Sequence, residues 1–464
     1  MKIFLAVFIC KTLYFIGKRV GKGSSLPGKI VLKIFPDVIR QLKLPKTIIA
    51  VTGSNGKTTA TELIAHVFKA NGKSVGWNYE GSNQTEGVAT LLLRLSSFNG
   101  KVKRDIIVME CDERYAKKIF ENMRPSILLV TNLCRDQLTR NGHPEFIEDC
   151  IRAAIIEAGK VKLVLNTDDP YVAALTRKTW YGSVSQFNET GDDIVPDDIL
   201  WLGINTASGT SERIGMYDDG AFCPVCKERM TYAYHIAGHF GNYNCVTCGL
   251  KRNDPDVEAT MQEHRGTGLL CFYENTVSLS PCVPCKMQVK LPGITSAYNF
   301  CSAVAVAKAV GISVRDSAKA LDGYELSGGR TMQLALGERN GMLLVSKHEN
   351  TFAYDMSLSW IIEQKKPCTV IVLVDAISRK YFTGETSWLW DINFGLLMDD
   401  NVKNIVLAGK YVNELAMRFA MTGVDKAKIG YIADLSGLRD YVEKNTVGDI
   451  YAVTCFSDKA KLFK

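Results

Sequence analysis

The distribution of apolar and polar residues predicts alternating strands and helices from Lys46 onward. Thr47–Val51 is an apolar, β-rich run that is followed by a Gly-rich turn and a helical pattern from about Thr58 to Asn71. Further buried-strand patterns, separated by helical stretches, occur at Asp105–Val108, Ser126–Thr131 and Val161–Asn166. This alternation is typical of an α/β fold with a parallel sheet and helices on both faces, which binds ligands at the carboxyl ends of its strands.

The pattern changes twice in the second half of the chain. From about Ile194 to Ser280, turn residues, aromatic residues and paired cysteines predict a small β-rich insertion. A helix is expected again at Ala297–Val310, and a linker at Ser327-Gly328-Gly329. Strand patterns then return at Val370–Val374, Asn404–Ala408 and Ile450–Thr454. We expect an N-terminal helical segment (1–44), an α/β domain (45–328) and a smaller C-terminal α/β domain (329–464).

Residues 1–23 contain a short apolar run whose positive residues mostly follow it, at Lys18, Arg19 and Lys22. A secretory signal carries its charges first and ends in a small-residue cleavage site, which is not evident here. The run is interrupted by Lys11 and is too short to cross a bilayer as a helix of about 20 residues. We expect an apolar-faced helix that packs or rests on a surface of a cytoplasmic protein, with contact to the inner membrane face left open.

Composition and charge exclude few functions. Hydrophobic residues make up 46% and charged residues 23%, as in soluble globular proteins. The net charge of +7 is modest, and apart from short clusters such as Lys18-Arg19 the chain has no concentrated basic run of the kind that binds nucleic acid. Most of the fourteen cysteines are scattered singly, which favours a cytosolic protein whose CxxC pairs bind metal rather than form disulfides.

A phosphate-binding loop is predicted at Thr52–Thr59 (TGSNGKTT), between a strand and a helix. Its glycines let backbone N–H groups point at phosphate oxygens, and the helix N-terminus adds positive charge. Lys57 would neutralise the β- and γ-phosphates, and the Thr58 hydroxyl would bind Mg²⁺. The general pattern has a glycine at position 51, where this chain has Val51. The expected nucleotide-binding residues are Gly53, Asn55, Gly56, Lys57, Thr58 and Thr59.

A Mg²⁺ ion needs further hard oxygen ligands besides Thr58. Glu110 stands at the end of a predicted strand, where such a ligand is expected, and Glu80 follows another short extended stretch. Either residue alone could be a solvated surface acid. Because a phosphate loop is present, we expect Glu110 to be a magnesium ligand with a catalytic role, and Glu80 is the weaker candidate.

Two CxxC pairs predict a zinc site. Cys223 and Cys226 are separated from Cys245 and Cys248 by 18 residues, which fits the spacing of a four-cysteine zinc ribbon at about residues 220–252. Four thiolates complete a tetrahedral shell, so the site is expected to be structural. A third pair, Cys282 and Cys285, has no partner pair nearby, which favours free thiols over a second metal site.

The chain resembles the MurT family, the ligase subunits of lipid II isoglutaminyl synthase, over nearly its full length. The TGSNGKTT turn alone would indicate only the Mur ligase superfamily. The narrower resemblance rests on several segments together, which are Glu80–Gly87 (EGSNQTEG), Met109–Glu113 (MECDE), Thr131–Gln137 (TNLCRDQ), Asn166–Pro170 (NTDDP), the four-cysteine ribbon with Gly249–Arg252 (GLKR), Tyr298-Asn299, Gly329-Arg330 and Thr386–Asp391 (TSWLWD).

The resemblance implies a Mur-ligase central domain with an inserted zinc ribbon and an ATP-dependent carbon–nitrogen ligase of peptidoglycan synthesis. It implies that ATP phosphorylates the α-carboxylate of D-glutamate in the lipid II stem peptide, and that ammonia then gives D-isoglutamine. A GatD-type glutaminase subunit would supply the ammonia, so the expected partner is a glutaminase and no nucleic acid. Asn299 and Arg330 would contact the adenine and ribose-phosphate end of ATP. The implied cofactors are ATP, Mg²⁺ and Zn²⁺.

The departures from the family pattern lie in the C-terminal domain. The family has an aspartate shortly before its Ser-Trp pair, thought to act with the active site of the glutaminase, and this chain has Glu385 there. We therefore expect Glu385 to be the third catalytic residue, although a solvated loop acid is an open alternative. A KNPAG stretch is replaced by Lys347–Thr351 (KHENT), and of an N-D-N run only Asp375 remains.

Other functions remain open at this stage. Another Mur-type ligase that adds an amino acid usually lacks the ribbon, and a paralogue that binds ATP without amidating would explain the C-terminal departures. A zinc-ribbon nucleic-acid binder would leave the phosphate loop unexplained. Lys178 lies where some Mur ligases carry a carbamylated lysine, but nothing in the spacing singles it out.

Overall fold

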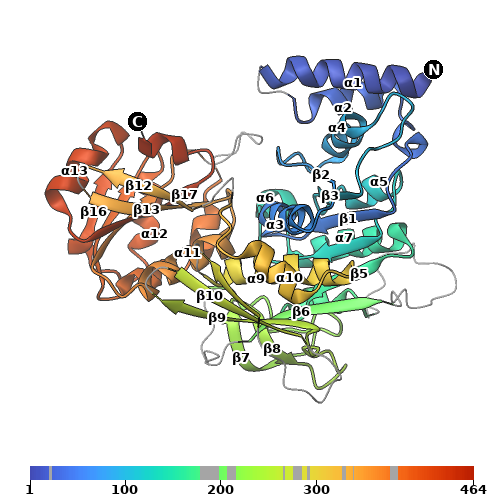
Figure 1. The fold of residues 1–464 in the computed structure, drawn as a ribbon. Helices are drawn as coiled ribbons and strands as arrows, with labels where there is room; N and C mark the ends of the chain where they lie inside the picture. Colours follow the sequence, from blue (N-terminus) through green and yellow to red (C-terminus); the bar gives the residue numbers. More distant parts are fainter. Residues whose placement is uncertain are drawn as a thin grey trace. The chain divides into compact units, whose positions relative to one another are not determined.

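Two compact units make up the chain (Figure 1). Unit 1 comprises residues 1–133, 144–211 and 220–326, and unit 2 comprises residues 134–143, 212–219 and 327–464. The structure, a computed structural model, describes residues 1–19, 23–177, 198–205, 216–264, 267–274, 285–289, 293–326, 331–337, 339–376 and 385–463.

The described strands of unit 1 form a nine-stranded sheet in the order β11-β10-β9-β6-β5-β4-β1-β3-β2. In this order, each pair of neighbouring strands between β9 and β2 is parallel. Strand β10 pairs antiparallel with β9 and β11. The strands are β1 (Thr47–Thr52), β2 (Val75–Trp77), β3 (Ile106–Glu110), β4 (Ile127–Val130), β5 (Lys162–Asn166), β6 (Ile199–Asn205), β9 (Val257–His264), β10 (Thr267–Glu274) and β11 (Cys285–Val289). The predicted α/β fold with a parallel sheet is confirmed.

The predicted β-rich insertion from about Ile194 to Ser280 is wrong in its extent. β6 continues the parallel sheet beside β5, and β9 continues it beside β6. Only β7 (Thr231–Ala237) and β8 (Phe240–Asn244) form a separate two-stranded sheet. The turn residues and cysteines of the ribbon interrupt the strand pattern in the sequence, and they concealed that the flanking strands belong to one sheet.

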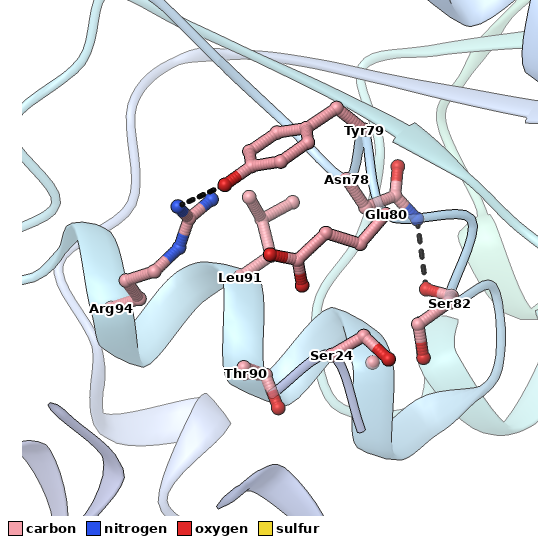
Figure 2. A pocket seen from close by; sticks show the side chains of 9 residues that line it. Ser24, Asn78, Tyr79, Glu80, Ser82, Thr90, Leu91 and Arg94 are labelled. Atoms are coloured by element: carbon pink, nitrogen blue, oxygen red, sulfur yellow. Dashed lines mark hydrogen bonds between the residues drawn. The ribbon is translucent and has the colours of Figure 1, made fainter. Parts of the chain in front are cut away.

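Two N-terminal helices, α1 (Lys2–Arg19) and α2 (Leu26–Ile34), pack with α4 (Thr85–Leu95) at one end of unit 1 (Figure 1). Arg94 of α4 donates to the hydroxyls of Tyr14 (3.2 Å) and Tyr79 (3.4 Å), and Figure 2 shows its guanidinium pointing at Tyr79. Among the residues that the structure describes, none of the helices has the length and apolarity that crossing a membrane requires.

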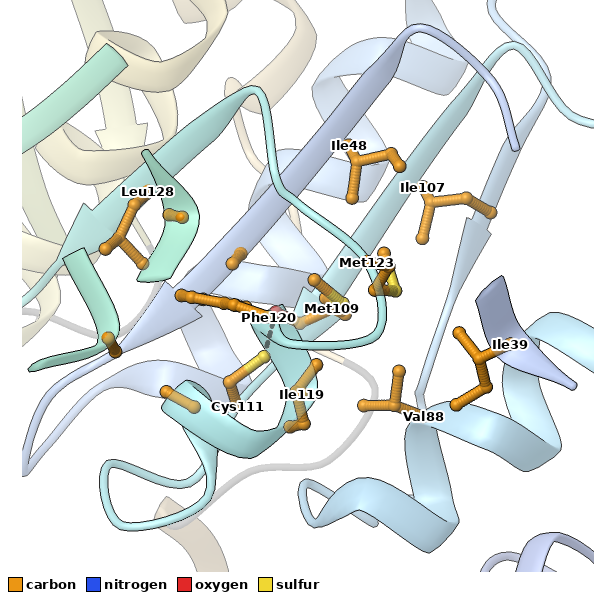
Figure 3. Close-up of a cluster of buried hydrophobic side chains, with 14 of the residues drawn as sticks. Ile39, Ile48, Val88, Ile107, Met109, Cys111, Ile119, Phe120, Met123 and Leu128 are labelled. Atoms are coloured by element: carbon orange, nitrogen blue, oxygen red, sulfur yellow. Dashed lines mark hydrogen bonds between the residues drawn. The ribbon is translucent and has the colours of Figure 1, made fainter. Parts of the chain in front are cut away.

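The core of unit 1 lies on both faces of its sheet, because successive strand residues point to opposite sides. Ile48, Ile107 and Met109 point to the face covered by α5 and α4, where Phe120 and Val88 meet them (Figure 3). The other face packs against α3 and α9. The remaining helices of unit 1 complete these layers, with bounds α3 (Lys57–Ala70), α5 (Ala116–Phe120), α7 (Pro144–Ala158), α8 (Pro170–Ala174), α9 (Ile294–Ala309), α10 (Val314–Leu321) and the 3₁₀ turn η1 (Ile39–Gln41).

Unit 2 is built on a six-stranded sheet in the order β12-β13-β17-β14-β15-β16, parallel except for β12 against β13. Buried apolar clusters cover both of its faces. Its strands are β12 (Thr331–Leu336), β13 (Arg339–Ser346), β14 (Cys368–Leu373), β15 (Val402–Ala408), β16 (Ile429–Ile432) and β17 (Asp449–Cys455). Its helices are α6 (Leu138–Asn141), α11 (Thr351–Glu363), α12 (Val412–Phe419), α13 (Leu438–Asn445), η2 (Ser387–Asp391), η3 (Phe394–Met398), η4 (Lys426–Lys428), η5 (Leu435–Gly437) and η6 (Lys459–Phe463).

Candidate nucleotide site and zinc ribbon

The predicted phosphate loop connects the end of β1 to the start of α3 at the carboxyl edge of the sheet. Gly53 (φ 121°) and Gly56 (φ 83°) both lie in the left-handed region that favours glycine. A Cβ atom at Gly53 would lie 2.4 Å from Thr131 Oγ1, and one at Gly56 would lie 2.2 Å from Asn299 Oδ1. Both glycines are therefore required, and Asn299 of α9 lies directly against the loop.

Thr131 and Asn132, just after β4, hold the loop in place. Ser54 N–H donates to the Asn132 carbonyl (2.8 Å), and Asn55 N–H donates to Asn132 Oδ1 (2.9 Å). The Asn55 carbonyl accepts from Thr131 Oγ1 (2.7 Å) and Asn132 Nδ2 (3.1 Å). The Thr-Asn pair of the TNLCRDQ segment thus fixes the backbone of the loop from a neighbouring strand.

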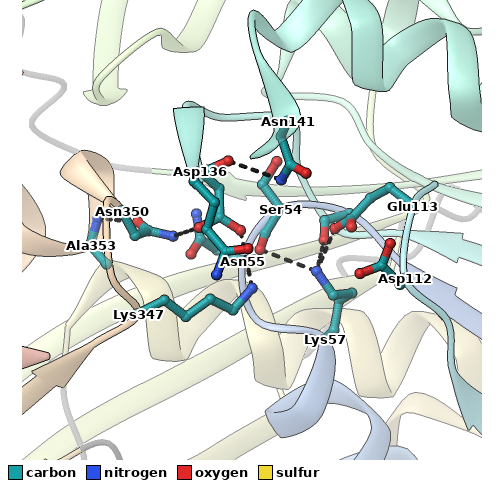
Figure 4. A network of polar contacts seen from close by, with 12 residues as sticks. Ser54, Asn55, Lys57, Asp112, Glu113, Asp136, Asn141, Lys347, Asn350 and Ala353 are labelled. Atoms are coloured by element: carbon teal, nitrogen blue, oxygen red, sulfur yellow. Dashed lines mark hydrogen bonds and ion pairs between the residues drawn. The ribbon is translucent and has the colours of Figure 1, made fainter. Parts of the chain in front are cut away.

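Lys57 is the first residue of α3 and is only 4% exposed. Its ammonium group donates to the Gly53 and Ser54 carbonyls and forms an ion pair with Glu113, which is 3% exposed (Figure 4). A buried ammonium is costly without such a partner. The sequence does not predict this role for Glu113. The MECDE segment has three acids, and spacing alone does not show which of them faces the loop.

Thr58 and Glu110 are brought together beside the start of α3. Thr58 Oγ1 donates to Glu110 Oε2 at 2.7 Å, and Asn83 Nδ2 donates to Glu110 Oε1 at 2.9 Å. Asn78 binds the Glu110 backbone on both sides, accepting from its N–H (2.8 Å) and donating to its carbonyl (3.0 Å). Hydroxyl and carboxylate oxygens are the donors that Mg²⁺ prefers, so this pair fits a magnesium site next to the phosphate loop. Thr59 is half-buried in the same helical turn.

Glu80 has different partners from Glu110. Its carboxylate accepts from the Tyr14 hydroxyl of α1 at 2.8 Å, and Tyr14 also contacts the Tyr79 hydroxyl at 2.9 Å. Glu80 lines a small pocket with Tyr79 and Arg94 (Figure 2). The structure therefore brings Thr58 and Glu110 together and links Glu80 to the N-terminal helix.

Asp168 of the NTDDP segment is a buried carboxylate that connects helix α9, strand β6 and the end of the cysteine ribbon. It accepts from Tyr298 Oη (2.8 Å), Arg252 Nε (2.7 Å) and Ile204 N–H (2.7 Å). Burial raises the pKa of Asp168, and the Arg252 guanidinium counteracts that rise. Tyr298, which the resemblance assigns to the adenine end, is buried with its hydroxyl engaged by Asp168. Arg330, Lys178 and Cys282 lie outside the described residues, and Cys285 begins β11.

The predicted ribbon contains two knuckles with the same backbone hydrogen bonds. The Cys223 carbonyl accepts from Lys227 N–H (2.9 Å), and the Cys245 carbonyl accepts from Gly249 N–H (2.9 Å). Cys223 N–H donates to the carbonyl of residue 228 and Cys245 N–H to that of residue 250, each at 2.8 Å. Lys227 (φ 64°) and Gly249 (φ 72°) both have positive φ, which completes each turn. β7 and β8 connect the two knuckles.

The four cysteine sulfurs converge on one point. All lie within 4.8 Å of one another, with 3.5 Å between Cys223 and Cys248 and 3.4 Å between Cys226 and Cys245. Sulfur atoms around a tetrahedral zinc, each about 2.3 Å from it, are about 3.8 Å apart. The donor set and spacing fit a structural zinc ion. The ribbon is joined to the sheet by Tyr243, whose hydroxyl donates to the Thr167 carbonyl at 2.9 Å.

Unit 2 brings together residues of three segments that lie far apart along the chain. Arg135 of TNLCRDQ forms an ion pair with Asp219 (2.7 Å) and approaches Asp391 of TSWLWD at 4.0 Å. Asp136 accepts from Lys347 Nζ (3.1 Å) and Asn350 Nδ2 (2.8 Å), both in the KHENT segment (Figure 4). The KHENT segment thus keeps a lysine and an asparagine, and both bind the aspartate of the TNLCRDQ segment.

Glu385, the third expected catalytic residue, is an exposed acid immediately before η2. Its Oε1 accepts from Ser387 N–H at 2.7 Å, and hydrogen bonds from Ser387 lower the pKa of Glu385. The carboxylate is therefore ionised at neutral pH, and it binds the first residue of the 3₁₀ turn that carries the buried Trp388.

Comparisons with known families match two parts of the chain. Residues 51–250 match the Mur ligase middle domain, and residues 348–457 match the MurT ligase C-terminal domain. Subunit MurT of the glutamine-hydrolysing lipid II isoglutaminyl synthase of Streptococcus pneumoniae is 26% identical over 458 residues, which cover 98% of this chain and 95% of that protein. The corresponding subunit of Staphylococcus aureus is 26% identical over 427 residues, covering 92% and 89%.

The fold is also similar to solved structures. A pseudomurein peptide ligase type C from Methanothermus fervidus superimposes with a TM-score of 0.67 at 18% sequence identity, covering 91% of this chain and 79% of that one. At this identity the likeness concerns the fold.

Proposed function

Because the chain belongs to the MurT branch of the Mur ligase family, it is an ATP-dependent ligase that forms carbon–nitrogen bonds, and we propose that it amidates the lipid II stem peptide. The acceptor would be the α-carboxylate of D-glutamate, and the product D-isoglutamine. A carboxylate oxygen attacks the γ-phosphorus of ATP to give an acyl phosphate and ADP. Ammonia then displaces phosphate, which leaves with one of the original carboxylate oxygens.

The phosphate loop would bind and orient ATP for this attack. Gly53 and Gly56 let the loop backbone approach the phosphates closely, and the N-terminus of α3 faces them. Lys57 would exchange its contact with Glu113 for the β- and γ-phosphate oxygens. Asn299 lies against Gly56, so it would contact the nucleotide from the α9 side. Arg330 would complete this set at the ribose-phosphate end.

Thr58 and Glu110 would hold a Mg²⁺ ion, which neutralises charge on the transferring phosphoryl group. Asn78 holds the backbone of Glu110 and Asn83 holds its carboxylate, so the position of the carboxylate is fixed. Glu110 and Asn78 are buried, which strengthens the electrostatic effect of the carboxylate on developing charge, and Thr58 lies at the exposed side of the pair.

The four cysteines of the ribbon would hold a structural Zn²⁺ ion. Arg252, four residues after Cys248, binds Asp168, which in turn holds Tyr298. The ion would therefore have no direct part in the reaction. It would stabilise the ribbon, whose last residue, Arg252, holds Asp168 and through it Tyr298 next to the nucleotide site.

The ammonia would come from a GatD-type glutaminase subunit. The named relatives are subunits of glutamine-hydrolysing synthases, which motivates this partner. Glu385 is exposed and ionised next to the TSWLWD signature, so it could orient a group on the partner from a surface position. We propose that it replaces the family's aspartate at this interface.

The observation that carries the proposal is the presence of a complete phosphate loop and a MurT-type C-terminal domain in one chain. The test uses lipid II whose D-glutamate carboxylate carries heavy oxygen, with Mg-ATP and ammonium. We expect heavy oxygen to appear in the released phosphate, in step with the amide. Amide formation without that transfer would contradict the acyl phosphate. Stimulation of ATP hydrolysis by an amino acid, and not by ammonium, would instead indicate an amino-acid-adding Mur ligase.

A further inference from the structure

Helix α1 carries apolar side chains on two opposite faces. One face, with Ala6, Val7, Cys10 and Gly17, is buried against α2 and α4. The opposite face presents five large apolar side chains that are between 45% and 61% exposed, which are Phe4, Leu5, Phe8, Phe15 and Ile16. A surface helix in water normally has charged and polar residues opposite its buried stripe. A cluster of exposed aromatic and aliphatic side chains of this size marks an interaction surface.

The charge of the chain is concentrated in the same region. Residues 1–44 contain nine lysines and arginines and one acidic residue, which gives a formal charge of +8. The whole chain carries +7, so the remaining 420 residues together carry −1. Lys2, Lys18 and Arg19 of α1 and Lys29 and Lys33 of α2 are exposed. The surface that would meet the apolar face is therefore expected to be negatively charged.

Basic and aromatic side chains also lie together on this surface. The Arg19 guanidinium lies 4.5 Å from the centre of the Phe15 ring, and Lys11 Nζ lies 5.3 Å from that of Phe98. Phe98 packs against Phe4 with ring centres 5.1 Å apart. Long basic side chains that run along apolar surface can keep their charges at the level of lipid headgroups while the rings enter the acyl region.

We propose that α1, with the basic residues of α2, docks this protein onto an anionic phospholipid bilayer. The helix would lie in the plane of the interface, because its Ala6–Gly17 stripe is covered by α2 and α4 and cannot face lipid. Anionic lipid supplies both an apolar layer for the five large side chains and negative charge for the lysines, which no purely apolar protein surface would do. Exposed apolar side chains and positive charge carry this proposal, which is independent of the proposed substrate.

The docking helix is connected to the candidate magnesium site within unit 1. Tyr14 of α1 binds Glu80 and Tyr79, and the side chain of Asn78, the residue before Tyr79, binds the backbone of Glu110. One short loop therefore separates the proposed membrane contact from the residues that would hold the nucleotide's metal. Docking would place that edge of the sheet near the bilayer surface.

The test is co-sedimentation of the full chain with vesicles of phosphatidylglycerol and phosphatidylcholine, compared with phosphatidylcholine alone. We expect binding only with the anionic vesicles, and weaker binding at high salt. The triple variant Lys18→Gln, Arg19→Gln, Lys29→Gln should bind about a hundredfold more weakly, because each basic side chain near the surface contributes about a factor of five. The variant Phe8→Ser, Phe15→Ser, Ile16→Ser should bind at least about tenfold more weakly.

The matched control is Met398→Ser, Met417→Ser, Met421→Ser, which removes three exposed apolar side chains from unit 2 and should bind like the parent chain. Melting temperatures of all variants establish that they fold. Failure of the parent chain to sediment with anionic vesicles would overturn the proposal. Unchanged vesicle binding by the variant Phe8→Ser, Phe15→Ser, Ile16→Ser would also overturn it. A parent dimer that this variant converts to a monomer, with vesicle binding unchanged, would show that a second copy covers the face.

Discussion

Lys57 is the residue on which phosphate binding most depends, because its ammonium group is buried among loop carbonyls and pairs with Glu113. We predict that Lys57→Ala lowers the rate of ATP hydrolysis by about three orders of magnitude, the effect of removing one preorganised donor from a transferring phosphoryl group. The measurement is phosphate release at saturating Mg-ATP. Lys73→Ala, an exposed lysine after α3, is the control and should hydrolyse ATP normally.

Glu113 is a charge partner of the buried Lys57 ammonium group. Glu113→Gln removes the carboxylate that pairs with this buried ammonium, which costs about 3 kcal/mol of unfolding free energy. We expect Mg-ATP to restore much of that loss, because its phosphates would take the place of the carboxylate. Urea unfolding with and without nucleotide measures both values. Equal destabilisation under the two conditions would show that Lys57 does not exchange Glu113 for phosphate.

Asp355 of α11 gives unit 2 a predicted pH dependence. Burial raises its pKa to about 7, although Asn393 N–H donates to it at 2.8 Å and Arg418 lowers the pKa. The unfolded pKa is about 3.9, so between about pH 4 and pH 7 the unfolded chain releases this proton and the folded chain keeps it. Stability contributed by the neutral carboxyl is thus present below about pH 4 and is lost as pH rises through 7, by up to about 4 kcal/mol.

The variant Asp355→Asn should remove this decline, because an amide oxygen can still accept from Asn393 and cannot ionise. The measurement is the urea midpoint of the full chain from pH 4 to pH 8. Asp400→Asn, which changes an exposed acid in the same unit, should leave the decline in place. A parallel pH profile in the parent chain and Asp355→Asn would contradict the assignment.

Sequence reasoning placed individual residues well where a motif fixes the backbone, and their roles in a nucleotide site stay predictions. Lys57, Thr58 and Glu110 lie at strand and helix ends, and the parallel sheet brings such ends together. It missed Glu113, Asn78 and Asn83, because their roles depend on which way a side chain turns after a strand. Glu80 illustrates the same limit, since its carboxylate meets Tyr14, 66 residues away along the chain.

At the scale of elements, the zinc ribbon is the part whose stability should depend on a bound ion. β7 and β8 form an isolated two-stranded sheet, and such a hairpin is marginal in water without further support. We predict that the purified chain contains one zinc per molecule and that chelation removes hydrogen-exchange protection from β7 and β8. The loss should extend to Thr167 and Asp168, which Tyr243 and Arg252 bind.

Cys226→Ser should reproduce the effect of chelation, and the control Cys150→Ser, a half-buried cysteine of α7, should keep its zinc. Protection that survives zinc removal would mean that the packing of Tyr243 and Leu250 suffices to hold the ribbon.

Most elements were predictable because the buried strands of a parallel sheet are continuous apolar runs. β1, β3, β4 and β5 each fall within two residues of the expected bounds. The strands β6, β9 and β10 were assigned to an insertion, because one-sided burial in β9 and β10 gives a weaker signal and the ribbon interrupts the pattern. Long-range neighbours such as β6 and β9 are set by tertiary packing, which local sequence patterns do not record.

At the scale of the whole molecule, the chain joins two kinds of parallel-sheet unit with separate sets of functional residues. Unit 1 carries the phosphate loop, the candidate magnesium pair, the ribbon and the basic N-terminal helices. Unit 2 carries residues 348–457, which match the MurT ligase C-terminal domain and include Glu385. The amidation proposal assigns activation of the carboxylate to the first and the supply of ammonia to the second.

This division predicts separable defects. Glu385→Gln should retain amidation with free ammonium and lose most of the activity that depends on glutamine and a glutaminase subunit. The two rates are compared in parallel assays on one preparation, and Glu414→Gln serves as the control. Equal loss with both nitrogen sources would place Glu385 outside the coupling between the subunits.

The central claim is tested most directly by mass spectrometry of lipid II after incubation with the purified chain, Mg-ATP and nitrogen-15-labelled ammonium. The account predicts that the D-glutamate α-carboxylate becomes a labelled primary amide, and that Lys57→Ala forms none. Lipid II that remains a free acid while ATP is hydrolysed, with ammonium and with glutamine plus a glutaminase subunit alike, would contradict it.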